Sequence, residues 1–116
     1  MQSEQPPFPP ARPRRSTGER LREALTVLAQ GKAKVLSHSE RNWASITFAG
    51  ARHRIALSFE GAEAVTAGEL FIAFLPEHEF AIPGQIVADA TVIEVDHRFD
   101  PPVLRVTCEL LLLEEA

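Results

Sequence analysis

The fold of this chain is decided by Gln85–Leu113, which reads QIVADATVIEVDHRFDPPVLRVTCELLLL. Apolar and polar residues alternate on both sides of a central turn, His97–Pro102, whose two prolines cannot donate to a sheet ladder. Alternation with a period of two is typical of strands that bury one face. The stretch therefore predicts an antiparallel hairpin at the centre of a sheet.

The register of this hairpin can be predicted from its two faces. Pairing Asp96 with Val103 creates one nearly unbroken apolar face, and it places Glu94 opposite Arg105 as a pair of opposite charges. The same register points Asp89 toward the apolar face. A carboxylate in that position must find donors or a cation, or keep its proton, because burying an unpaired charge is too costly.

The length and composition indicate one ordinary globular domain. The chain has 116 residues, of which 45% are hydrophobic and 24% charged. Its one cysteine, Cys108, excludes an intrachain disulfide and is expected to be a small buried side chain. No apolar run has the length of a membrane span, and charged residues after Arg14 and Arg15 argue against a twin-arginine export signal. We therefore expect a cytoplasmic protein.

The charge is unevenly distributed along the chain. Residues 1–34 carry seven Arg and Lys against three Glu, whereas residues 35–116 carry five against thirteen acidic residues. Residues 1–15 are rich in proline, so we expect a disordered arm that ends where a single domain, residues 16–116, begins. Within the arm, Pro7–Arg12 matches the pattern that aromatic grooves read in polyproline ligands, although such matches are common in proline-rich tails.

Two helices are predicted. Ser16 and Glu19 have the spacing of a capping box, apolar residues follow at helical spacing, and Gly31 is a suitable left-handed stop. The segment Gly61–Leu75 also has helical spacing and ends before Pro76, although its last five residues alone would equally suit a buried strand. We favour a helix there.

Further strands are predicted between these helices. Ala33–His38 is a short strand candidate, and Ser39–Asn42 is expected to be a turn. Trp43–Phe48 and Arg52–Phe59 flank Gly50 and Ala51, which suit a two-residue hairpin turn. The face of this hairpin predicted to enter the core carries Ala44, Ile46, Phe48, His53, Ile55 and Leu57.

Together these elements predict an α+β fold in which an antiparallel sheet of four or five strands packs one face on two helices. The predicted order is helix, two or three strands, helix, two strands. This order is similar to that of type III secretion chaperones, which are small, acidic and dimeric. No motif accompanies the likeness, so no residue role is transferred from it.

The candidate chemistry is sparse. His53 and Asp89 are both predicted on core faces and could form an acid–base couple, but they could equally be a structural hydrogen bond or never meet. Loop histidines beside carboxylates are the candidates for a metal, although their spacing matches no known metal motif. These metal candidates are Glu77, His78, Glu79 and His97. We expect no cofactor, and an enzyme is the less favoured interpretation.

The second face of the predicted sheet is the strongest functional signal. It is too apolar for a solvated surface, and such area usually marks an interface. The residues predicted to form it are Trp43, Ala88, Ala90, Val92, Leu111 and Leu113. We therefore predict a non-catalytic protein-interaction module, with itself as a homodimer or another protein as partner. The alternatives are a small-ligand or enzymatic domain and nucleic-acid contact by Arg12, Arg14 and Arg15, which the acidic body disfavours.

Overall fold

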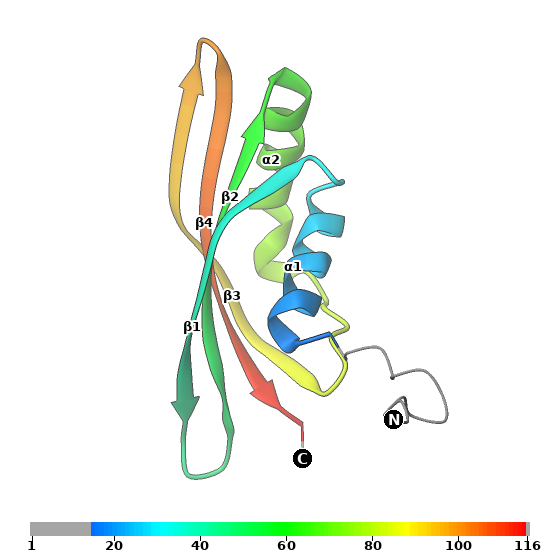
Figure 1. Ribbon diagram of the computed structural model, residues 1–116, viewed down its shortest axis with the longest axis vertical. Coiled ribbons are helices and arrows are strands. Elements are labelled where there is room, and N and C mark those ends of the chain that lie inside the picture. The colour runs from blue at the N-terminus through cyan, green and yellow to red at the C-terminus, as the bar shows by residue number, and fades with distance from the viewer. Residues whose placement is uncertain (1–14, 116) are drawn as a thin grey trace, which may run out of the picture.

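The computed structural model describes residues 15–115. The elements follow one another as α1 (Thr17–Leu28), β1 (Ala33–Ala44), β2 (Ala49–Glu60), α2 (Ala62–Phe74), the 3-10 helix η1 (Leu75–Glu77), β3 (Gln85–Phe99) and β4 (Pro102–Glu114). The strands form one antiparallel sheet in the order β1-β2-β4-β3, and both helices lie on the same side of it (Figure 1). The predicted α+β architecture is confirmed. Apart from Arg15, the predicted arm and its polyproline pattern lie outside the described residues.

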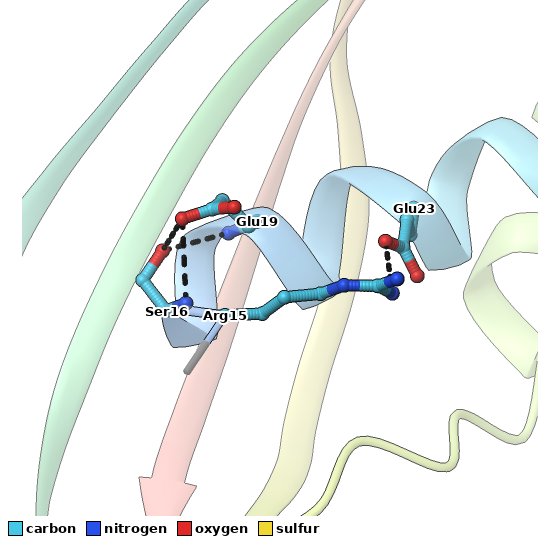
Figure 2. Close-up of polar contacts among 4 residues, drawn as sticks. All are labelled: Arg15, Ser16, Glu19 and Glu23. Carbon is cyan, nitrogen blue, oxygen red and sulfur yellow. Dashed lines mark hydrogen bonds and ion pairs between the residues drawn. The ribbon is translucent and has the colours of Figure 1, made fainter. Parts of the chain in front are cut away.

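Helix α1 begins as predicted. The Ser16 hydroxyl accepts from the Glu19 amide at 3.1 Å, while the Ser16 amide donates to the Glu19 carboxylate at 3.4 Å, which completes the capping box (Figure 2). Past the other end of the helix, Gly31 has a φ of +70°, a conformation that glycine adopts without steric cost. Helix α2 also confirms the prediction, and η1 follows it where Pro76 stops the α-helical pattern.

The first hairpin differs from the prediction. β1 continues through the expected turn Ser39–Asn42 as far as Ala44, and the chain reverses at residues 45–48 instead of at Gly50. The Ser45 hydroxyl makes this turn by accepting from the amides of Thr47 and Phe48, at 3.2 and 3.0 Å. Ile46 is consequently fully exposed and Phe48 is 45% exposed, so the prediction that both enter the core is wrong.

The central hairpin is present, but its predicted register is wrong over most of its length. Val103 pairs with Arg98 instead of Asp96, and two bulges, at Ala88 and Ile93, each add one residue to β3. The two bulges together remove this two-residue offset, so that the predicted pairing is found only at the end far from the turn, where Val87 pairs with Leu112. Between the bulges the alternation is shifted by one residue, which turns Asp89 away from the core. Arg105 pairs with Asp96, not with Glu94.

The core lies between the helices and one face of the sheet. β2 contributes His53, Ile55, Leu57 and Phe59, and β4 contributes Leu104, Val106, Cys108, Leu110 and Leu112, all at most 1% exposed. Phe59 packs against Phe71 of α2 at a ring-centroid distance of 5.9 Å. Helix α2 comes this close because Gly68 has no side chain: a Cβ there would lie 2.7 to 2.9 Å from Leu104 and Phe59.

Candidate protein-interaction surface

The sheet has one face that no described element covers. Both helices pack on the other face, where β2 and β4 bury alternate residues (Figure 1). The residues between them, such as Arg52, Arg54 and Leu111, point to the opposite side. We call this side the open face. In an ordinary antiparallel sheet such a face is solvated and polar. The apolar and charged residues on the open face of this sheet therefore indicate what it can contact.

One row of paired residues across the open face is apolar. Trp43 of β1 pairs with Gly50 of β2, Gly50 pairs with Leu113 of β4, and Leu113 pairs with Ile86 of β3. We call these four residues the apolar row. Gly50 has no alternative in this row, because a Cβ there would lie 1.9 Å from the carbonyl oxygen of Leu112. Ile86 remains 46% exposed. The row therefore presents the Trp43 ring on one side of the gap at Gly50 and two aliphatic side chains on the other.

The next row is charged. It runs Arg41–Arg52–Leu111–Asp89 from β1 to β3, and we call it the charged row. Arg41 and Arg52 are cross-strand neighbours of like charge, an arrangement that destabilises a sheet. Neither arginine forms an ion pair with any residue between 15 and 115, and the same holds for Asp89. The charged row therefore has unbalanced positive charge at one edge of the sheet and unbalanced negative charge at the other.

A shallow depression surrounds the two arginines. It measures about 350 Å³ and is lined by Ser39, Glu40, Arg41, Arg52, Arg54 and Glu109. Arg54 is already engaged, because its Nε and Nη2 donate to one Glu109 oxygen at 3.0 and 2.7 Å. Glu40 pairs across the strands with His53 and therefore points to the helix-covered side, so the arginines of this depression share one open-face carboxylate, that of Glu109. The chemistry suits an additional carboxylate from outside.

The six residues predicted to form the interface divide between the two faces. Trp43, Leu111 and Leu113 lie on the open face, as their pairing partners require. Ala90 and Val92 instead pair with Leu110 and Cys108 and pack against the core, so their predicted face is wrong. Ala88 sits in the first bulge and is exposed. The cause is again the unpredicted bulges of β3.

The predicted couple of Asp89 and His53 is not assembled. Asp89 lies on the open face, exposed, with the Thr91 hydroxyl 3.3 Å from its Oδ2 atom. His53 lies on the helix-covered face of β2 and is 1% exposed. The two side chains are therefore on opposite sides of the sheet, with β4 between their strands, and this arrangement offers no shared proton. The prediction of a core-facing Asp89 is wrong.

His53 has a different partner, which no pattern in the sequence indicates. Its Nδ1 atom lies 2.9 Å from His38 Nε2, and His38 Nδ1 lies 2.6 Å from an Arg22 guanidinium nitrogen. A guanidinium only donates, so His38 accepts at Nδ1 and donates from Nε2 to His53. This chain of hydrogen bonds joins α1 to β1 and β2. It could have been predicted only with β1 extended to Ala44, which makes His38 a neighbour of His53.

Both rings of the His38–His53 pair have a lowered pKa, which favours their uncharged forms. Burial lowers the pKa of His53, while the carboxylate of Glu40 opposes that change. Burial also lowers the pKa of His38, and the charges of His53 and Arg22 lower it further against Glu40. A protonated ring has no nitrogen left to accept a hydrogen bond, so protonation of either histidine would break the chain of hydrogen bonds that begins at Arg22. The pair is best understood as a structural connection between the two layers.

The residues predicted to bind a metal lie in separate places. His78 follows η1 and meets Phe80 edge to face at 4.5 Å, whereas His97 of β3 stacks on Phe99 at 4.2 Å. Glu77 and Glu79 flank His78 and are exposed. Across residues 15–115 no group of three or more histidine, cysteine or acidic side chains has the arrangement of a metal site. The same part of the chain has no helix long and apolar enough to span a membrane.

Of the three arginines considered for nucleic-acid contact, only Arg15 is described. It is exposed and forms an ion pair with Glu23, two turns along α1 (Figure 2). Arg12 and Arg14 lie outside the described residues. The positive charge of Arg15 is therefore partly balanced within the chain.

No protein-family model and no curated protein matches this chain. Among solved structures, its fold is similar to a chain of the structure described as "Virion of native gene transfer agent (GTA) particle". The TM-score is 0.55 and 14% of the aligned residues are identical, over 85% of this chain and 92% of that chain. At this identity the likeness shows a shared fold.

Proposed function

We propose that this chain is a non-catalytic subunit of a protein assembly, that it contacts other protein chains through the open face, and that a second copy of itself is its first partner. The observation that carries the proposal is the apolar row beside the charged row. Apolar side chains next to uncompensated arginines are what the centre and rim of a protein interface contain. A solvated sheet face needs neither.

Two further observations support this proposal. The chain with the similar fold belongs to a virion particle, which favours a role in assembly with other protein chains. The two residues considered for catalysis, Asp89 and His53, lie on opposite sides of the sheet. A cytoplasmic location remains the prediction made from the sequence.

The test is the mass of the protein in solution, measured by light scattering after gel filtration over a range of concentrations. We expect a mass approaching twice the 12.8 kDa chain mass at high concentration. Replacing Ile86→Lys in the apolar row should return the mass to that of one chain, because the lysine charge would have to be desolvated in the interface.

A matched control uses Val27→Lys on α1, where the native side chain is 77% exposed on the helix side. This variant should keep the mass of the wild type. Circular dichroism confirms that both variants are folded. A protein that keeps the mass of one chain at all concentrations, and that also recruits no other protein through Ile86, contradicts the proposal.

A further inference from the structure

Some charged residues of the open face form ion pairs within the chain and others do not, depending on where they lie along the strands. Near the start of α2, Lys34 and Glu60 lie 4.0 Å apart, and Arg98 and Asp96 lie 3.5 Å apart, so these four charges have partners within the chain. Arg105, the cross-strand neighbour of Asp96, is in no ion pair among residues 15–115. Toward the β1–β2 turn the situation changes. Arg41, Arg52 and Asp89 are in no ion pair among residues 15–115. The same holds for Glu94, which lies farther from this turn, in the row of Ala56 and Thr107.

These uncompensated charges are separated by sign. Arg41 and Arg52 lie on β1 and β2, whereas Asp89 and Glu94 lie on β3 at the far edge of the sheet. The order β1-β2-β4-β3 puts β4 and its Leu111 between the two signs. They cannot neutralise one another within a chain, because neighbouring strands are about 4.8 Å apart and three such spacings separate β1 from β3.

We infer that two copies of the chain pack open face to open face about a twofold axis that runs along the strands between β2 and β4. This inference rests on the proposed function and specifies its partner. The axis places β1 of one copy over β3 of the other, and β2 over β4. Arg41 then faces Asp89 of the second copy, and the same contact recurs on the other side of the axis, as an isologous interface requires.

The apolar row agrees with this arrangement. An axis along the strands leaves each row at its own level, so the apolar row packs on the apolar row of the second copy. Trp43 then faces Ile86 of the second copy, and Leu113 faces the gap that Gly50 leaves. One operation thus brings opposite charges together at both edges of the charged row, and it brings apolar side chains together along the apolar row. Arg52 lies over Leu111 of the second copy, so this operation leaves its charge beside the Arg41–Asp89 contact without a counter-charge of its own.

The other possible axes do not achieve this. A twofold axis in the sheet plane but across the strands would place β1 and β2 over themselves, so that arginines would approach the basic half of the second copy. An axis normal to the sheet cannot bring the two open faces together. Like charges brought together at an interface oppose association.

The available area suits a stable dimer. Four strands about 4.8 Å apart give a width of roughly 19 Å, and the 12 residues of β2 at about 3.3 Å each give a length of roughly 40 Å. The face thus offers on the order of 750 Å² per copy and about 1,500 Å² in total. Specific protein interfaces bury about 1,200–2,000 Å² in total.

A charge-exchange experiment on the full chain tests this geometry. One variant carries Arg41→Glu and Arg52→Glu, and the other carries Asp89→Arg and Glu94→Arg. Each should dimerise at least about tenfold more weakly than the wild type. In each variant, position 41 of one copy would face a residue of the same charge at position 89 of the other copy. An equimolar mixture should recover a complex of two different chains, which native mass spectrometry resolves when one chain bears a tag.

Controls and contrary outcomes separate this inference from the proposed function. Arg20→Glu on α1 and Glu69→Arg on α2 reverse charges on the helix side and should leave dimerisation unchanged. If the wild type dimerises and Ile86→Lys disrupts it, but the mixture does not recover, the open face is an interface and the inferred axis is wrong. A mixture that forms complexes larger than two chains indicates head-to-tail packing and also overturns the axis. Wild-type dimerisation that does not weaken with added salt contradicts the charge pairing.

Discussion

The two faces of this sheet are built from the same strands, but they differ in how far their side chains are buried and paired within the chain. On the helix-covered face, His53 has its hydrogen-bond partner in His38, and the apolar residues of β2 and β4 are at most 1% exposed. On the open face of the same strands, Arg52 lies beside Arg41 without a counter-charge among the described residues. The covered face is complete within one chain. The open face has neither a counter-charge for these arginines nor a covering element among the described residues.

This difference predicts that substitutions on the two faces affect different quantities. Changes on the covered face should alter the free energy of unfolding, because they disturb packing that exists in one chain. Changes on the open face should alter association and leave the folding of the single chain almost unaffected.

The largest effect is expected for Phe59→Ala. Phe59 is fully buried, packs on Phe71 and lies against the surface where α2 comes closest to the sheet. Removing its ring leaves a cavity that the two layers cannot close, so we expect a loss of about 3–5 kcal/mol in the free energy of unfolding. Urea denaturation of the isolated chain measures it. A loss below about 1 kcal/mol would show that the layers are not packed as described.

The covered face was predicted well because caps, helical spacing and strand alternation can be recognised within a few neighbouring residues. Ser16 and Glu19 predicted where α1 begins, and the spacing up to Pro76 predicted α2, because caps and helical periods are encoded within a few residues. His53, Ile55 and Leu57 were placed on the core face correctly although the turn beside them was wrong, since alternation along one strand does not depend on its partner.

Pairings between strands were predicted poorly. Bulges at Ala88 and Ile93 carry no glycine or proline to announce them, yet they decide which way Asp89, Ala90 and Val92 point. The turn at Ser45 depends on one hydroxyl, and Gly50 offered a more familiar alternative. The His38–His53 contact and the Arg41–Arg52 pair both depend on this turn, so neither could be recognised from the sequence.

The His38–His53 pair predicts an intermediate effect that depends on pH. The pKa of both rings is lowered in the folded protein, so the unfolded chain binds more protons once the pH falls below about 6.5. Stability from this pair is fully present above that pH and is lost progressively as the pH falls toward the lowered values. The urea midpoint should therefore decrease between pH 7.5 and 5.

A double variant, His38→Gln with His53→Gln, should remove this part of the pH dependence. His78→Gln is the matched control, because it replaces an exposed histidine on the loop after η1, outside the pair. An identical fall of the urea midpoint in the double variant and the control would show that the pair does not titrate with folding.

The smallest effect has the opposite sign. Neutralising the like-charge neighbours with Arg41→Gln and Arg52→Gln should raise the stability of the single chain by about 0.2–1 kcal/mol, because it removes a cross-strand repulsion. The same variant should dimerise more weakly. Thermal denaturation at a concentration that keeps the chain monomeric measures the first change. A variant that is less stable as a monomer would indicate that the arginines already have a partner within the chain.

The fluorescence of Trp43 tests the central claim most directly, because it is the only tryptophan in the chain and lies in the apolar row of the open face. As the protein concentration rises through the range in which the mass doubles, its emission should shift to shorter wavelength and become protected from quenching by acrylamide. Emission and quenching that stay constant while the mass doubles would contradict the account, since the copies would then meet on another surface.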